Sequence, residues 1–376
     1  MLNRYLFSAT LLWLCLTSCL RPTAVGLTAS GLSRTHFQSK TDSLSTDLYV
    51  LTNSQGMEVC LTNYGARVVS IMVPDREGTL RDVVLGFDSI QDYRKYPNNL
   101  GAVLGRCANR LGQARVTIGG KEYSLPQNNG PHCLHSGPEG FHTRTFWVER
   151  SSEREVVMCY VSPEGEAGFP GRLSCTVTYK LTDDNALEIR YSATSDQPTL
   201  CNLTNHTYFN LDGDPTLTNL DYLLQITSDS YLPIDSTGLP TGAIDRVEGT
   251  PLDFRQAARV GDRCDLPFAS IRHARGIDQN WLLPPSVDRP AATVYSPRSG
   301  IILEVYTDQP GIQVYGANAL NGTLRGKRGV AYGPRCAICL ETQCYPDAPH
   351  HPEWPSVLLC PDERYEHHCT YRFRRE

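Results

Sequence analysis

Hydrophobic and polar residues alternate along much of the chain, which is typical of β-strands with one buried face. Apolar and polar side chains alternate at every position from Ser174 to Leu181, and again from Leu187 to Ala193 after an Asp-Asp-Asn turn. Because successive side chains on a strand point to opposite faces, each arm would bury one face and expose the other. The pattern predicts an antiparallel hairpin.

Shorter strands are predicted elsewhere. Four apolar-rich runs bounded by Gly, Asn, Asp or Pro lie at 47–52, 57–63, 67–73 and 82–86. A second hairpin is expected where strands at 116–118 and 122–125 flank Gly119-Gly120, since this dipeptide tolerates the positive φ angles of a tight turn. Long amphipathic helical patterns do not occur in the sequence. The chain is therefore predicted to be all-β, a large antiparallel β-sandwich.

Composition excludes several classes of function. The 376 residues are 40% hydrophobic and 20% charged, with a formal net charge of -5. Because there is no basic surplus to attract phosphate backbones, nucleic acid is not expected as a partner. The sequence also lacks the P-loop, GxSxG and GxGxxG patterns, which argues against phosphate-cradling, esterase and dinucleotide chemistry.

The N-terminal residues differ from the rest of the chain. Arg4 precedes the apolar run Leu6 to Leu20, and small residues follow at 24–26, so residues 1–26 are interpreted as a secretory signal peptide of a secreted protein. The alternatives are an uncleaved anchor or a bacterial lipoprotein acylated at Cys19. No later stretch approaches a membrane span. Residues 27–45 are interpreted as a linker, and the folded domain is expected at 46–376.

Cysteines and glycosylation sequons add little chemistry. Of 14 cysteines, twelve remain if Cys15 and Cys19 leave with the signal peptide, and their scattered spacing permits disulfides without implying them. Cys336 and Cys339 have the gap of a metal or redox pair but no second pair, so they are interpreted as apolar strand residues and no metal is expected. Of three sequons, only the one at Asn321 is expected in an exposed loop.

The segment 337–356 contains the first candidate for catalysis. An apolar run from Ala337 to Leu340 leads to a single carboxylate, Glu341, and four prolines then exclude a continuing central strand. Burial would raise the pKa of this carboxyl towards the operating pH, which makes it a candidate general base. The alternative is a structural acid that closes the strand by pairing with an arginine.

Five other segments place polar side chains at strand ends or beside glycine turns. A histidine within an apolar strand end can transfer a proton near neutral pH, whereas acids, amides and aromatic rings are the groups that bind sugars. The candidates in these segments are Asn109, Arg110, His135, His206, Tyr208, Asp278 and Gln313.

These segments resemble, in their order and in their residues, the motifs of a known family. The stretches 105–110, 129–137, 202–211, 278–281, 310–320 and 340–355 resemble those of the aldose 1-epimerases, the galactose mutarotases. The resemblance covers roughly residues 47–373. It implies the β-sandwich of the galactose mutarotase type and interconversion of the α and β anomers of free aldoses such as galactose and glucose, without metal or organic cofactor.

The resemblance also implies a role for each candidate residue. Glu341 would be the general base and His206 the general acid. Sugar binding would fall to Asn109, Arg110, His135, Tyr208, Asp278 and Gln313. The chain departs from the family at Gln279, where histidine is common, and at Ser136, where glycine is common; both departures bear on substrate preference.

Mutarotation sets a geometric expectation. The base removes the proton of the anomeric hydroxyl while the acid protonates the ring oxygen, so the two groups are expected to face each other across the cavity with space for one pyranose between them. A monomer is expected, with a monosaccharide as its partner. Two alternatives remain: a non-catalytic sugar-binding protein on this fold, and a hexose-phosphate epimerase, which would need a basic cluster for the phosphate.

Overall fold

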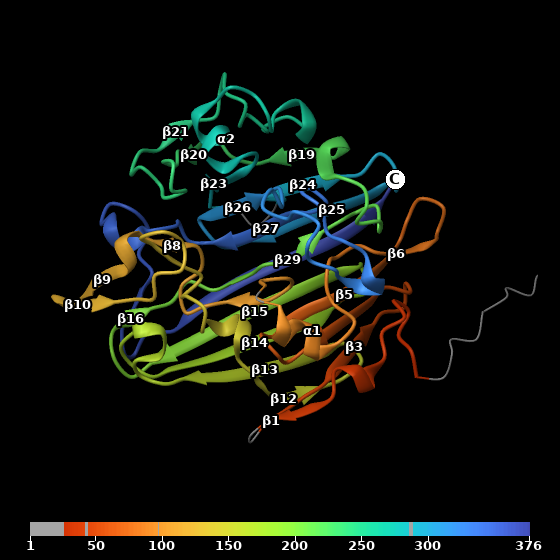
Figure 1. Ribbon diagram of the computed structural model, residues 1–376, viewed down its shortest axis with the longest axis horizontal. Coiled ribbons are helices and arrows are strands. Elements are labelled where there is room, and N and C mark those ends of the chain that lie inside the picture. Colours follow the sequence, from red (N-terminus) through yellow and green to blue (C-terminus); the bar gives the residue numbers. More distant parts are fainter. Residues whose placement is uncertain (1–25, 42–43, 97, 286–288) are drawn as a thin grey trace, which may run out of the picture.

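The largest sheet of the fold is antiparallel and has nine strands. The computed structural model describes residues 26–41, 44–96, 98–285 and 289–376 (Figure 1). The predicted hairpin forms the centre of this sheet as β14 (Leu173–Leu181) and β15 (Ala186–Ser195), paired from Leu173 with Ser195 to Leu181 with Leu187. In order, the nine strands are β12 (Trp147–Ser151), β13 (Glu155–Ser162), β14, β15, β29 (Tyr365–Arg375), β25 (Ile301–Thr307), β24 (Ala292–Tyr295), β19 (Leu223–Ile226) and β22 (Ala258–Arg259).

A second layer combines a six-stranded and a four-stranded sheet. The six strands are, in order, β18 (Tyr208–Phe209), β27 (Ile338–Gln343), β26 (Gly311–Tyr315), β23 (Asp278–Leu282), β20 (Ser230–Leu232) and β21 (Asp245–Arg246). The four are β3 (Leu48–Thr52), β4 (Glu58–Thr62), β5 (Arg67–Pro74) and β6 (Leu80–Asp82). All pairings between these strands are antiparallel.

The strand expected at 82–86 is wrong after Asp82, because the chain there connects two sheets. β6 ends at Asp82, after which the Val83 N–H donates to Ile71 O of β5 (2.9 Å). The Leu85 N–H instead donates to Tyr208 O of β18 (2.9 Å). Backbone pairing is thus divided between partners, and the two sheets become one layer.

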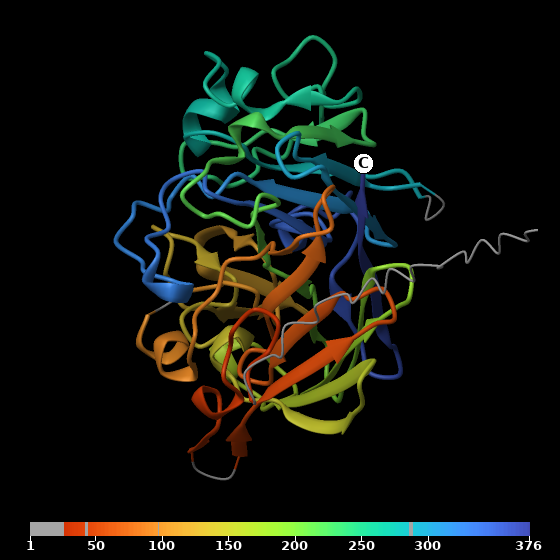
Figure 2. The same ribbon diagram turned by 90° about the vertical axis from the view of Figure 1, so that its right-hand side faces the viewer.

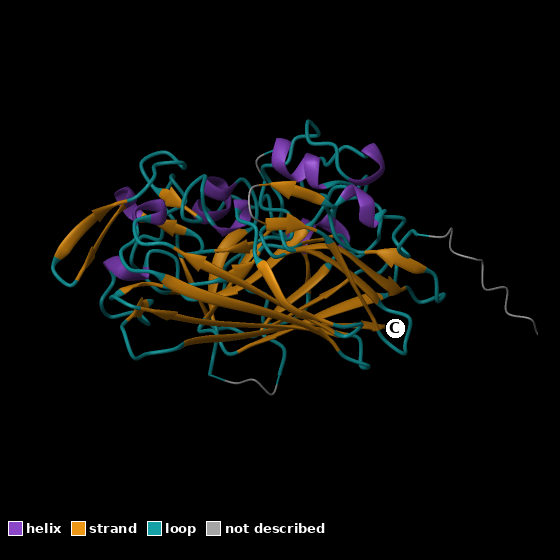
Figure 3. Ribbon diagram, turned by 90° about the horizontal axis from the view of Figure 1, so that it is seen from below, coloured by secondary structure: helices purple, strands orange, loops and turns teal. Residues whose placement is uncertain are grey.

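Small sheets and single helical turns complete the fold. The expected Gly119-Gly120 hairpin is confirmed as β9 (Arg115–Ile118) and β10 (Lys121–Ser124), which project from the body at the left of Figures 1 and 3. The other two-stranded pairs are β1 (Ser39–Thr41) with β2 (Leu44–Thr46), β7 (Val103–Leu104) with β17 (Thr204–Asn205), β8 (Arg110–Leu111) with β11 (Cys133–Leu134), and β16 (Thr199–Leu200) with β28 (Leu358–Leu359).

The helices in the described part of the chain are short. The α-helices are α1 (Ile90–Lys95) and α2 (Ala269–Ala274). The 3₁₀ turns are Arg34–His36, Gly112–Ala114, Phe141–Thr143, Glu166–Gly168, Asn219–Asp221, Val260–Asp262, Lys327–Gly329 and Ala348–His350. Most of them lie on one side of the strand layers (Figure 3), so they do not interrupt the packing between sheets.

The main hydrophobic core lies between the two layers. Val177 and Ile189 of the nine-stranded sheet belong to one buried cluster with Val59 of β4 and Leu340 of β27. The cluster is continuous because alternate residues of each strand face it, as the period-two pattern predicts. The predicted all-β sandwich is confirmed.

Residues 27–45 differ from the linker that their composition suggested. The part described contains a 3₁₀ turn and β1, and both Leu32 (1% exposed) and Phe37 (0%) are buried in a cluster with Leu48. The Ala29 N–H also donates to the buried carboxylate of Glu58 (2.8 Å). Figure 2 shows this segment, in red, against the lower edge of the domain. Although the segment is mostly polar, burial of the Leu32 and Phe37 side chains holds it against the domain. The segment is therefore part of the folded domain.

The proposed signal peptide lies outside the described residues, apart from Gly26. In the residues that the structure does describe, no helix is long and apolar enough to cross a membrane.

Cysteines serve as small apolar side chains in this fold. All twelve cysteines in the described residues are free thiols, and every one except Cys360 is buried. Cys336 and Cys339, which have the spacing of a metal pair, lie in an apolar cluster. Burial raises the pKa of the Cys336 thiol to about 12, which suppresses the reactive thiolate.

The folded domain is therefore expected to be independent of disulfides. Titration of denatured protein covering residues 27–376 should find all twelve thiols without prior reduction, and a reductant should leave the melting temperature unchanged. A lower thiol count, or a melting temperature that falls on reduction, would show that disulfides hold the native fold together.

Candidate active site

One polar cavity collects all the residues predicted to act on a sugar. It has a volume of about 450 Å³ and lies over the six-stranded sheet. This volume falls within the range of about 300–1,000 Å³ that is usual for small-molecule sites. The predicted residues on its wall are Asn109, Arg110, His135, His206, Tyr208, Asp278, Gln313 and Glu341. Residues more than 200 positions apart in the sequence thus meet at one place.

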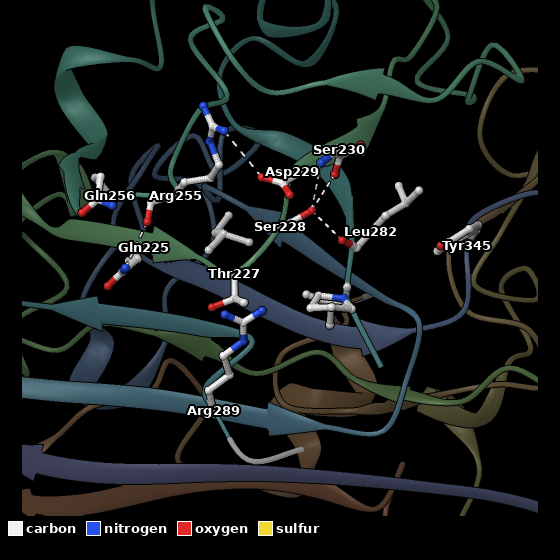
Figure 4. A pocket seen from close by; sticks show the side chains of 13 residues that line it. Gln225, Thr227, Ser228, Asp229, Ser230, Arg255, Gln256, Leu282, Arg289 and Tyr345 are labelled. Carbon is white, nitrogen blue, oxygen red and sulfur yellow. Dashed lines mark hydrogen bonds and ion pairs between the residues drawn. The ribbon is translucent and has the colours of Figure 1, made fainter. Parts of the chain in front are cut away.

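A second hollow of about 670 Å³ beside β19 and β23 has different chemistry (Figure 4). Several of its polar groups bond one another: Arg255 lies 3.5 Å from Asp229, and Ser228 Oγ donates to Ser230 O (2.7 Å). None of the predicted site residues lines it. The smaller cavity is therefore the candidate active site.

Strand register brings three polar side chains to the cavity. Gln313 of β26 is directly opposite Glu341 of β27, and Asp278 lies on the next strand, β23. Neighbours on these strands, such as Leu340, point to the opposite face and into the core. Gln313 Nε2 donates to Asp278 Oδ1 (2.7 Å), which fixes both side chains. One face of the sheet therefore builds the core while the other builds the site.

His206 lies between β17 and β18 with its backbone fixed. Its N–H donates to Ala102 O (2.8 Å). The imidazole stacks on Tyr208, with ring centroids 4.8 Å apart and an interplanar angle of 14°. The rings of Tyr315 (6.2 Å) and His135 (5.4 Å) approach it edge-on. Aromatic packing thus sets the direction of the imidazole.

Glu341 and His206 are neighbours on the cavity wall. Glu341 Oε1 lies 3.5 Å from His206 Nε2, which leaves no room for a sugar ring between them. The expected arrangement across the cavity is therefore wrong. Since the anomeric hydroxyl and the ring oxygen are bonded to the same carbon, an acid and a base that lie side by side can still reach both of them.

Burial favours the uncharged form of both groups. It raises the pKa of the Glu341 carboxyl well above its ordinary range, and the nearby Asp278 raises it further. Burial also lowers the pKa of His206 to about 3. The two groups together then hold one proton over a wide pH range, with the carboxylic acid beside a neutral imidazole favoured in the free enzyme.

His135 faces the same pair as a hydrogen-bond donor. Its Nδ1 accepts the Asn109 N–H (3.0 Å), so the neutral ring carries its proton on Nε2. His135, His206 and Glu341 have ligand atoms within 4.8 Å of one another, close enough for a metal ion. A metal needs a free lone pair, however, and the tautomer of His135 offers a proton instead. These side chains fit a sugar hydroxyl better than a metal.

Arg110 supplies one of the two guanidinium groups that the described residues place on the cavity wall. Its Nε donates to Asn129 Oδ1 (3.0 Å), and its backbone N–H donates to Asn109 Oδ1 (2.9 Å). Burial raises the pKa of Asp278, while the guanidinium of Arg110 and the amide of Gln313 oppose that rise. Donors and acceptors thus alternate around the cavity, as the hydroxyls of a sugar require.

The two departures from the family pattern do not reach the cavity. Gln279 is fully buried, with its Oε1 accepting the Asp278 N–H (3.0 Å) and its Nε2 donating to Ser270 O (3.1 Å). Ser136 Oγ accepts the Cys107 N–H (2.8 Å). Both side chains hold the backbone beside a site residue, so neither is placed to select the sugar directly.

Sequence reasoning missed other parts of the wall. The additional residues with polar or aromatic character include Asn99, Asn129, Ser236, Thr237, His273, Arg275, Tyr315 and Asn318. Several lie in loops without periodicity. The one signal that was available, the Asp235-x-Thr237-Gly238 turn signature, predicts a local turn but says nothing about where the turn packs.

The fold and the cavity together define a class of protein, the carbohydrate-converting enzymes built on a large antiparallel sandwich. The family model described as aldose 1-epimerase matches residues 47–372. The chain belongs to the aldose 1-epimerase family, and it is an isomerase that interconverts anomers.

Individual relatives agree with this assignment. The chain is 41% identical over 338 residues to galactose mutarotase of Mus musculus, covering 90% of this chain and 93% of the relative. It is 39% identical over 334 residues to aldose 1-epimerase of Escherichia coli, covering 88% and 95%. Among solved structures, the aldose epimerase homologue from C. elegans superposes with a TM-score of 0.82 at 32% identity, covering 88% of this chain and 99% of that one.

The shared proton predicts an unusual pH profile. The pair loses its base only when His206 is protonated beside a protonated Glu341, and burial moves this step below the ordinary histidine pKa of about 6.5. It loses its acid only above the raised pKa of Glu341. After subtraction of spontaneous mutarotation, kcat/KM should be flat between about pH 6 and 7.5. An independent imidazolium acid would instead make kcat/KM fall tenfold per pH unit above about 6.5, which would contradict proton sharing.

Proposed function

We propose that this cavity interconverts the α and β anomers of free galactose and glucose, with Glu341 and His206 as the acid–base pair. The observation that carries the proposal is the 3.5 Å contact between Glu341 Oε1 and His206 Nε2 at the cavity wall. A pair this close can serve the two oxygens of one anomeric carbon at the same time. Relatives named galactose mutarotase support galactose as a substrate.

Ring opening follows from the geometry. Glu341, as the carboxylate, removes the proton of the anomeric hydroxyl, and His206, as the imidazolium, protonates the ring oxygen. The bond between the anomeric carbon and the ring oxygen breaks, which leaves an open-chain aldehyde. Rotation about the adjacent carbon–carbon bond presents the other face of the aldehyde, and ring closure returns both protons.

Burial assists this cycle. The reactive form begins as an ion pair and ends, with the sugar open, as a carboxylic acid beside a neutral imidazole. Burial favours that uncharged state, because it raises the pKa of Glu341 and lowers that of His206. The open-chain stage is therefore the stage that the enzyme's own side chains stabilise, and the total charge of the pair stays constant throughout.

The remaining wall residues would hold the sugar. The guanidinium of Arg110 and Nε2–H of His135 are donors, whereas the carboxylate of Asp278 is an acceptor. Tyr208 stacks behind His206 and offers an aromatic edge to the cavity. These groups would orient the hydroxyls so that the anomeric carbon meets the acid–base pair. Since every one of them comes from a single chain, we propose that the monomer is active.

Replacing Glu341 with Gln tests the acid–base pair. The variant keeps the shape of the side chain but cannot exchange a proton, so polarimetry with fresh α-D-glucose should show a rate about 10²–10⁴-fold lower. Glu58→Gln, on β4 and also buried (9% exposed, against 2% for Glu341), is the control and should keep the wild-type rate. A wild-type rate for Glu341→Gln would refute the assignment.

The same assay separates the alternatives. A sugar-binding protein without turnover would bind galactose saturably in calorimetry but leave the rate of mutarotation unchanged. If the protein is a hexose-phosphate epimerase, glucose 6-phosphate should compete with free glucose and inhibit its mutarotation at concentrations well below that of the glucose present. Within the described residues, the cavity wall carries two guanidinium groups, those of Arg110 and Arg275. The charge of Arg110 is partly balanced by the nearby carboxyl of Asp278, whose rise in pKa it opposes. This favours the uncharged sugar.

We propose further that the protein is exported and glycosylated at Asn321. The proposal is supported by the apolar N-terminal segment and by the contrast between the sequons: Asn202 and Asn205 are each 1% exposed, whereas Asn321 lies in an exposed loop. Asn321 Oδ1 also accepts the Thr323 hydroxyl of its own sequon (2.7 Å).

Expression with the native N-terminus in mammalian cells tests export. The secreted protein should carry one N-glycan, so a peptide N-glycosidase should lower its mass, and Asn321→Gln should abolish the change. Retention of the protein inside the cell, or secretion without a glycan at Asn321, would contradict this proposal.

A further inference from the structure

A short loop beside the cavity has a shape that it makes by itself. This rim loop, residues 235–239, is closed by the Asp235 N–H, which donates to Leu239 O (2.9 Å). Asp235 Oδ1 accepts the N–H of Thr237 (2.8 Å), the N–H of Leu239 (3.1 Å) and the Thr237 hydroxyl (2.6 Å). The loop is therefore a preformed turn, and Thr237 and Gly238 place it on the cavity wall.

One histidine attaches the rim loop to the segment that precedes β11. His132 is 2% exposed and does not line the cavity. Its Nδ1 accepts the Gln113 N–H (3.2 Å), so the neutral ring carries its proton on Nε2, which lies 2.8 Å from Thr237 Oγ1. Since the Thr237 hydroxyl donates to Asp235, it accepts from His132. Each donor in this series of hydrogen bonds, from Gln113 through His132 and Thr237 to Asp235, therefore has an acceptor.

The rim loop packs directly on the guanidinium of Arg110. Gly238 has a φ angle of +82°, and a Cβ atom added there would lie 3.0 Å from both Cζ and Nη2 of Arg110. A glycine is therefore required twice over, by its backbone conformation and by the closeness of the guanidinium. On its other side the guanidinium is held by Asn129, whose Oδ1 accepts from Nε (3.0 Å).

We propose that the rim loop is a positioning element of the active site, in which His132 and Gly238 act on the reaction by holding Arg110 in place. His132 fixes the loop, and the missing side chain of Gly238 lets the loop support the guanidinium. The inference rests on the proposed function, because Arg110 would bind the sugar. Arg110 also opposes the rise in the pKa of Glu341, so its position affects the acid–base pair.

Gly238→Ala is the first test. The added methyl would displace the guanidinium, and since a misplacement of about 1 Å can cost 10²-fold in rate, kcat/KM for galactose should fall about 10–100-fold. Gly165→Ala is the matched control, because Gly165 has nearly the same φ (+81°) but nothing within 4 Å of the added Cβ. It should keep wild-type kcat/KM. Equal losses in both variants would assign the effect to backbone strain and overturn the proposal.

A double-mutant cycle shows whether the loop acts through Arg110. In an Arg110→Met background, Gly238→Ala should change kcat/KM less than about twofold, since the group that it displaces is gone. Independent, multiplying losses would contradict the proposal. Gly238→Ala and Arg110→Met should also both move the alkaline limb of the kcat/KM profile to higher pH, because the carboxyl of Glu341 loses a nearby positive charge. A merely structural defect would leave that limb in place.

The hydroxyl of Thr237 gives an independent test. Thr237→Val removes the acceptor of His132 and should lower kcat/KM about tenfold, whereas Thr237→Ser should retain most of it. Thr216→Val is the control, because Thr216 makes the same bond to Asp214 Oδ1 (2.7 Å) in a turn outside the cavity. Wild-type kcat/KM for Thr237→Val would overturn the role of the bond between His132 and Thr237.

Calorimetric binding of galactose to wild-type protein separates the two hypotheses. If wild-type protein binds galactose but does not accelerate mutarotation, the proposed function fails, and the positioning role is then judged on affinity alone. In that case Gly238→Ala should still weaken binding relative to Gly165→Ala. Equal affinities of these two variants would refute the positioning role by itself.

Discussion

The active site depends above all on the pairing register between β26 and β27. With Gln313 opposite Glu341, the carboxyl of Glu341 faces the cavity while Ile338 and Leu340 enter the core. A shift by one residue would bury the carboxylate between the sheets and expose the leucine, at a cost in both charge burial and apolar area. Tyr371 of the other layer adds a bond from its hydroxyl to Leu340 O (2.9 Å). The stability of the sandwich and the position of the Glu341 carboxyl thus have one cause.

Burial then determines the chemistry of the groups that the sheet presents. The same loss of water that raises the pKa of Glu341 lowers that of His206, and it raises the pKa of the thiols in the core. For the thiols this means inertness. For two titratable groups 3.5 Å apart it means a shared proton, which is the state that a reaction with no net proton uptake requires. Environment, more than residue type, thus separates the inert thiols of the core from the two titratable groups on the cavity wall.

Loops supply what the sheet alone cannot. The sheet contributes Asp278, Gln313 and Glu341, whereas Arg110, at the start of β8, and His135, in the turn after β11, come from segments outside that sheet. These segments are ordered by their own polar bonds, such as that of the Asn109 N–H to His135 Nδ1. A donor bonded in this way has a known tautomer and direction before the sugar arrives, which lowers the entropy lost on binding.

The sequence by itself determined the fold class, the two hairpins predicted at 174–193 and 116–125, and eight of the residues that meet at the cavity. Alternation within a strand is local, so it can be read without knowing the partner strand. Only the tertiary structure decided that Glu341 and His206 lie side by side, that Gln279 points away from the cavity, and that residues 27–41 belong to the domain. These facts depend on register and on contacts between segments far apart in the chain, and no local pattern of residues encodes such distances.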